Sequence, residues 1–296
     1  MDTDTDTDAD TDTSQCWEGD WEITSELEME QFQPYSCITG DLTVYAQGLT
    51  FLDLPNLESV GGDFRIHFNA DLSGMDLGAL TSAGNLFIYD NYALSSLQGL
   101  DGLTEIDFMV VFRNNALTDF EGLNNLSDLT EGLSIENNHN LTSLTGLENL
   151  KIVEGGLCIL DNDSMTILDG LNNLESLNTM SIRGNDSLVS LAALGELSSL
   201  NGLGIHNNSA LTNLEGLGSL VSVGGLNISD NDSLVSLGGV SGIESVSGGL
   251  EIEYNPILPD CEVCDLLDRL SEAPETIDVY DNLNDSCTPV PDNCPK

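Results

Sequence analysis

Positive charge is scarce in this chain, and most of its Arg and His fall on one face of a repeat. Lys and Arg number six against 51 Asp and Glu, which gives a formal net charge of −45. Three of the four Arg and two of the three His fall on one face of a repeating unit, beside or next to a pair of apolar residues. Tyr and Phe take these positions in the first units. Exposed aromatic rings beside Arg are typical of a surface that binds a protein or a glycan.

The candidate face lies in the first four units of the repeat. One position stands between two apolar residues and another directly follows them, so both point away from the core of a strand. Next to these, at the edge of the predicted sheet, lie Phe68, Arg113 and Tyr254. An alternative is that aromatic residues favour strands and pack on cross-strand neighbours, with Arg113 and Glu136 forming a surface ion pair. The proposed ligand-binding residues are Tyr45, Arg65, His67, Phe87, Tyr89, Phe112 and Arg113.

Catalysis is the less favoured chemistry. Some extracellular β-helices cleave polysaccharides with carboxylates and basic residues on a sheet face, and this chain offers such groups over five units. It contains no GxSxG, HExxH or phosphate-binding loop and no His-rich metal motif. We therefore expect a recognition protein without cofactor, metal or catalytic residues. A structural surface or spacer protein without a specific ligand is the alternative. The residues that an enzyme would use are Glu136, Arg113, Arg183 and His206.

The unit that carries these positions is 22 to 24 residues long. Residues 133–156 show it fully: two apolar residues two positions apart, an Asn three residues later, then an apolar residue at every third position and a closing Gly-Gly pair. The pattern returns without a gap in 157–179, 180–202, 203–225 and 226–249. Contiguous repeats of this length indicate a solenoid, in which each coil packs on its neighbours.

The paired apolar residues place a short strand in every coil. Many are β-branched, and their alternation is typical of a strand with one buried face. Stacked coils then form one parallel sheet. We predict a mainly β fold, a right-handed parallel β-solenoid of about ten coils, which at about 4.8 Å per strand is a rod of roughly 45 Å.

An Asn stands five residues after the start of nine coils, and the first coil has Gln47 there. A stacked amide can bond backbone groups of its own coil and of the next, where the chain leaves the sheet. Some of these Asn fall in glycosylation sequons, but we favour the structural role. The predicted ladder is Asn69, Asn91, Asn114, Asn138, Asn162, Asn185, Asn208, Asn231 and Asn255.

Cysteines are grouped at both ends of the repeats, which predicts disulfide-stapled caps and an oxidising compartment. Cys16 and Cys37 can close a loop in a cap over 14–41. A second cap over 256–296 holds four more cysteines, whose pairing is open. Cys261 and Cys264 have CxxC spacing, so zinc is the alternative. Cys158 lies inside the repeats without an evident partner. The predicted disulfide cysteines are Cys16, Cys37, Cys261, Cys264, Cys287 and Cys294.

Residues 1–13 alternate six Asp with small residues, so we expect a disordered acidic linker before the cap and the solenoid of 42–255. A calcium loop is the alternative, but its Gly turn and bidentate Glu are missing. Such acidity argues against nucleic acid as a partner. No run of 18 apolar residues occurs. We expect an extracellular or cell-surface protein whose only membrane contact is a lipid anchor or secretion leader upstream of Met1.

The repeat resembles the receptor L-domain more than the ordinary leucine-rich repeat. In the latter an apolar residue follows the Asn by two positions, whereas here Asn138 precedes Leu141 by three. The Leu residues at threes, the closing V-x-G-G and the opening segment 37–44, CITGDLTV, are similar to that family over residues 37–255. The resemblance implies a ligand-binding solenoid such as those of the insulin and epidermal growth factor receptors and of bacterial surface lipoproteins. It does not imply a particular ligand.

Overall fold

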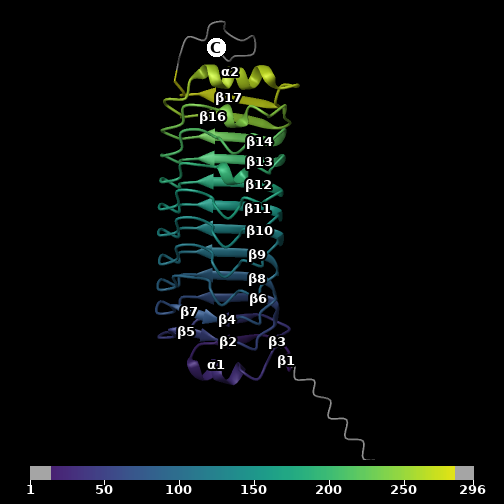
Figure 1. The fold of residues 1–296 in the computed structure, drawn as a ribbon, viewed down its shortest axis with the longest axis vertical. Coiled ribbons are helices and arrows are strands. Elements are labelled where there is room, and N and C mark those ends of the chain that lie inside the picture. The colour runs from purple at the N-terminus through teal and green to yellow at the C-terminus, as the bar shows by residue number, and fades with distance from the viewer. Residues whose placement is uncertain (1–14, 284–296) are drawn as a thin grey trace, which may run out of the picture.

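The computed structural model describes residues 15–283 and shows a parallel β-solenoid (Figure 1). Its main sheet has the strand order β1-β3-β6-β8-β9-β10-β11-β12-β13-β14-β16-β17, and β2, β4 and β15 join the same sheet. We call each layer in this order a rung, and the distance from one rung to the next a rung step. The linker predicted for 1–13, like Cys287 and Cys294, lies outside the described residues.

The element bounds follow the repeat. The strands are β1 (Cys16–Trp17), β2 (Trp21–Ile23), β3 (Cys37–Ile38), β4 (Leu42–Val44), β5 (Phe51–Asp53), β6 (Ser59–His67), β7 (Gly74–Asp76), β8 (Ser82–Tyr89), β9 (Glu105–Phe112), β10 (Asp128–Glu136), β11 (Ile152–Leu160), β12 (Ser176–Arg183), β13 (Ser199–His206), β14 (Ser222–Ser229), β15 (Ser245–Val246), β16 (Gly249–Glu253) and β17 (Thr276–Tyr280). The helices are α1 (Glu26–Phe32) and α2 (Asp260–Arg269), with short 3-10 turns at Ala192–Leu194 and Gly238–Val240.

Each coil is one strand followed by a series of tight turns. On β10 the side chains of Leu133 and Ile135 are fully buried, as the alternation predicts. The Leu residues at threes then return the chain by turns in which an N–H bonds a carbonyl three residues back, such as Leu147 N to Leu144 O at 3.1 Å. Because each such turn advances three residues, every third side chain points into the core. The predicted period of three thus has a backbone cause.

Within residues 15–283 the solenoid has twelve rungs rather than the ten predicted. One additional rung lies in each predicted cap. At the N-terminal end Trp21 and Ile23 of β2 pair in register with Leu42 and Val44 of β4. At the other end β17 continues the sheet beyond β16.

The Asn ladder is confirmed at all nine positions, whose side chains are fully buried. The side-chain oxygen of Asn138 accepts the backbone N–H of Asn114 at 2.9 Å, and its amide donates to Val111 O at 2.9 Å. Asn282, in the loop after β17, extends the ladder by one Asn, since its side-chain oxygen accepts the N–H of Asn255 at 3.2 Å. Since these amides are consumed by backbone bonds and buried, the sequons at Asn162 and Asn185 are not glycosylation sites in the folded chain.

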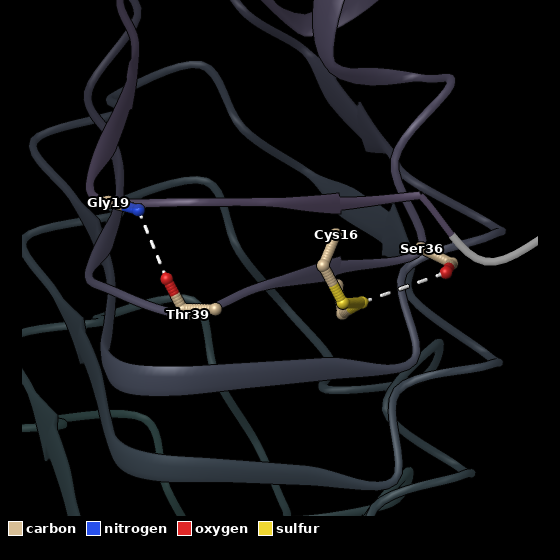
Figure 2. Close-up of a disulfide and its surroundings, with 5 residues drawn as sticks. Cys16, Gly19, Ser36 and Thr39 are labelled. Atoms are coloured by element: carbon tan, nitrogen blue, oxygen red, sulfur yellow. Dashed lines mark hydrogen bonds between the residues drawn. A yellow bond between two sulfur atoms is a disulfide. The ribbon is translucent and has the colours of Figure 1, made fainter.

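The N-terminal cap is fixed by a disulfide and an aromatic cluster. Cys16 and Cys37 are register partners on β1 and β3 and are disulfide-bonded, as predicted (Figure 2). Beside the disulfide the N–H of Gly19 donates to the hydroxyl of Thr39 at 3.0 Å (Figure 2). The rings of Trp17 and Trp21 meet edge to face at 4.7 Å, and both pack on the end of the core.

The C-terminal cap is built on α2, which lies beyond the last rungs (Figure 1). The helix begins directly after Pro259. Cys261 and Cys264 lie one turn apart in it and are both disulfide-bonded, so the zinc alternative is wrong. Cys158 is the free cysteine among the described residues. Across 15–283, neither helix has the length and apolarity that spanning a bilayer requires.

Candidate functional site

The centre of the candidate face is a stack of three rings at the ends of consecutive strands. Tyr45 follows β4, His67 ends β6 and Tyr89 ends β8. The rings of Tyr45 and His67 lie 5.8 Å apart and those of His67 and Tyr89 4.7 Å apart, nearly parallel in both pairs. Phe112 is the register partner of Tyr89 on β9 and continues the column. Since parallel strands in register superpose equivalent residues, the repeat itself stacks these rings.

Arg65 lies beside this stack, but its charge is already paired. Its guanidinium donates to Asp41 at 2.7 Å, contacts Asp63 and lies 5.5 Å from the centre of the Phe87 ring. The Arg65 hydrogen bond holds the pKa of Asp41 below its usual range, and Asp41 in turn raises the pKa of Arg65. Arg65 therefore orders Phe87 and two carboxylates rather than standing as an open anion site.

Arg113 is the more available cation. Its guanidinium lies 4.6 Å from the centre of the Phe112 ring. The ion pair with Glu136 considered above is not among those formed in residues 15–283, and Glu136 instead accepts the hydroxyl of Ser134. The cation–π contact holds the exposed Arg113 side chain over the end of the strand.

The residue after each strand is a feature that the sequence analysis did not recognise. At ten rungs its φ is positive, near +55° in most, and it directly precedes the ladder Asn. A left-handed conformation costs a residue with a Cβ roughly 1–2 kcal/mol, less for Asn and Asp. Seven of the ten positions carry Asp, Asn or Gly, and the other three carry Phe68, Arg113 and Tyr254.

Phe68 extends the ring stack at this strained position. Its ring meets those of His67 and Tyr89 edge to face at 5.1 and 5.6 Å. Its side chain is 58% exposed and that of Tyr45 is 42% exposed. The structure thus joins Tyr45, His67, Phe68 and Tyr89 into one exposed cluster, which we call the ring cluster.

The environment of His67 in this cluster shifts its titration. Burial between Tyr45 and Tyr89 lowers the pKa of its imidazole, and the charge of Arg65 lowers it further, while Asp90 acts in the opposite direction. Its Nδ1 is buried without a hydrogen-bond partner. The neutral ring is therefore the favoured form in the folded chain.

We expect an NMR titration to give His67 a pKa below that of histidine in an unstructured peptide, about 6.5. At pH values between the pKa of His67 in the folded state and its pKa in the unfolded state, the unfolded chain binds more protons. His67 therefore favours folding above its unfolded-state pKa, and this contribution is lost as the pH falls toward its folded-state pKa. Tyr89→Ser should raise the pKa of His67 by opening the stack. An imidazole that titrates at or above the peptide value would contradict this geometry.

The later rungs of the same face are lined by small side chains. A shallow hollow of about 440 Å³ crosses β11 to β16 over residues such as Ser181, Gly204 and Asn227. The His206 ring lies close against Gly204, and its Nδ1 is 2.9 Å from the hydroxyl of Ser229. Burial, then the charge of Arg183, lowers the pKa of His206. Burial also raises the pKa of the Cys158 thiol at the edge of this hollow.

The residues that an enzyme would use are not gathered at one point. Arg113 follows β9, Glu136 ends β10, Arg183 ends β12 and His206 ends β13. Four rung steps at about 4.8 Å separate the first from the last, roughly 19 Å. Of the described residues, no group of three His, Cys, Asp or Glu is placed to hold a metal ion.

The seven predicted site residues fall into three adjoining groups: the ring cluster, the Arg65–Phe87 pair and the Arg113–Phe112 pair. The carboxylate partners of Arg65 are not assigned by the sequence, although Asp41 and Asp63 each follow a Gly and directly precede the first buried residue of the apolar pair. Phe68, which the sequence predicts only as a residue of the sheet edge, contacts His67 and Tyr89. No protein-family model matches the chain, and no curated protein matches it in sequence, so the site rests on this geometry alone.

Proposed function

We propose that the chain is a recognition module that binds a protein or a glycan through the sheet face of its first rungs. The observation that carries this proposal is the ring cluster with Arg65 and Arg113 across β4, β6, β8 and β9, in a chain with six Lys and Arg. Aromatic and Arg side chains supply most of the binding energy at interfaces, and here their geometry is fixed before any ligand arrives.

We also propose an extracellular or cell-surface location. The described cysteines other than Cys158 are disulfide-bonded, which favours an oxidising compartment. A relation to receptor L-domains belongs to the same proposal. It is supported by the Asn-to-Leu spacing of three and by the parallel solenoid, on which such domains bind their ligands.

Tyr89→Ser combined with Phe112→Ser should weaken ligand binding by about 30-fold or more, because loss of an interface hot spot costs at least about 2 kcal/mol. The test is a glycan array and a displayed peptide library, read with the purified chain and with the variant. Tyr280→Ser is the matched control. Tyr280 occupies the same column on β17, eight rung steps from Tyr89, so its loss should leave binding unchanged.

A structural surface or spacer protein is the second candidate. It is favoured by the parallel stacking of Tyr45, His67 and Tyr89, which joins three coils whether or not a ligand exists. Under this alternative the double variant lowers the free energy of unfolding, and the wild-type chain binds neither library. A polysaccharide-cleaving enzyme is the remote third candidate, and turnover of a glycan by the purified chain would be needed to support it.

A further inference from the structure

We propose that Phe68 and Arg113 are the residues that select the partner, and that the partner is a protein segment carrying an apolar side chain and a carboxylate. The proposal rests on the function proposed above. Ten equivalent residues at the strand ends have a positive φ, so the side chains that the fold accepts at this position can be compared from rung to rung.

The fold does not need a bulky side chain at these positions. Asn137, Asn207 and Asp161 hold the same φ, within a degree of that of Phe68, and lead into ladder Asn residues bonded in the same way. Phe68 and Arg113 adopt this conformation at greater cost and with exposed side chains. Backbone strain that the fold does not require is concentrated at functional sites. Phe68 belongs to the ring cluster and Arg113 lies next to Phe112 in the same column, whereas Tyr254 lies far along the solenoid.

The exposed chemistry favours a protein over a glycan. The faces of the His67 ring are covered by Tyr45 and Tyr89, so a sugar ring has little stacking surface on this column. The exposed groups are the rings of Phe68 and Tyr45 and the guanidinium of Arg113. An aliphatic side chain fits against Phe68 and Tyr89.

Arg113 supplies the charge selection. Among the ion pairs formed in residues 15–283 none includes it, whereas Arg65 is held by two carboxylates. A ligand carboxylate can therefore pair with Arg113 without displacing an internal partner. Two rung steps separate Phe68 from Arg113, about 10 Å, which three residues of an extended peptide span.

The experiment selects binders to the wild-type chain from a displayed library of 12-residue peptides and measures their affinity for Phe68→Asn, Arg113→Asn and Tyr254→Asn. The last is the matched control, because Tyr254 has the same φ and a comparable ring contact, at 5.3 Å to Tyr280, far along the solenoid. We expect Phe68→Asn and Arg113→Asn each to lose tenfold or more in affinity while melting no lower than the wild type. Tyr254→Asn should bind unchanged, and the selected peptides should be rich in Asp or Glu beside an apolar residue.

The outcomes separate the two proposals. Peptides that bind both variants as tightly as wild type would overturn the selecting role of Phe68 and Arg113 while leaving the recognition face intact. Variants that melt several degrees below wild type without losing affinity would show that the two side chains serve packing. Binding to a glycan array but to no peptide would overturn the partner class, and binding to neither would overturn the recognition function itself.

Discussion

Asn138→Ala should lower the free energy of unfolding by about 2–6 kcal/mol. The substitution leaves the buried N–H of Asn114 and the buried carbonyl of Val111 without their partners, and each such group costs about 1–3 kcal/mol. The loss is large because every ladder Asn serves two coils at once. Urea unfolding followed by circular dichroism measures it.

Asn140→Ala is the control for this prediction. Asn140 lies two residues further along the same coil and is exposed, so its loss should change stability by no more than about 0.5 kcal/mol. A similar effect at both positions, or an effect of Asn138→Ala below about 1 kcal/mol, would mean that the ladder does not hold the coils together.

Replacing Cys16 and Cys37 by Ser should destabilise the chain by about 3 kcal/mol. The disulfide joins residues 21 apart in sequence, and opening a loop of this size returns chain entropy to the unfolded state. It also fastens the two-residue strand β1 to β3 at the end of the sheet. Thermal unfolding of the double variant and of the wild type gives the difference.

Cys158→Ser separates this effect from a general effect of losing sulfur. Cys158 is free and half-buried on β11, so the change should be within about 1 kcal/mol. Equal stability of the wild type and the Cys16/Cys37 double variant would show that the N-terminal rungs are held by the Trp17–Trp21 cluster alone.

The regular part of the fold could be predicted because the same residue pattern recurs in every coil. The alternating apolar residues Leu133 and Ile135 predict a strand and its buried face, and Asn138 three residues later predicts the ladder position. The two end rungs were missed for a different reason in each case. Trp21 and Ile23 alternate but lack the ladder Asn. Residues 277–282 follow the strand pattern, with Asn282 in place, but helix α2 replaces the turns that should precede them.

The sequence predicts which candidate residues share a column of the sheet, but not which side chains they contact. Once coils are in register, Tyr45, His67 and Tyr89 must superpose, and they do. Whether Arg65 is open or paired depends on Asp41 in the coil before, which only the three-dimensional register brings within reach. The prevalence of Asn, Asp and Gly at the position of Phe68 is visible in the sequence. That Phe68 adopts a costly left-handed conformation there becomes clear only from the backbone φ.

The most direct test of recognition through the first rungs compares two triple variants that remove equal chemistry from the two ends of one face. The first replaces Arg65 by Gln and Tyr89 and Phe112 by Ser. The second replaces Arg183 by Gln and His206 and Tyr280 by Ser. Both are read on the same glycan array and peptide library after near-ultraviolet circular dichroism has shown native packing. We predict that the first variant loses saturable binding and the second keeps it. Binding kept by the first and lost by the second would contradict the account and place the site over the later rungs.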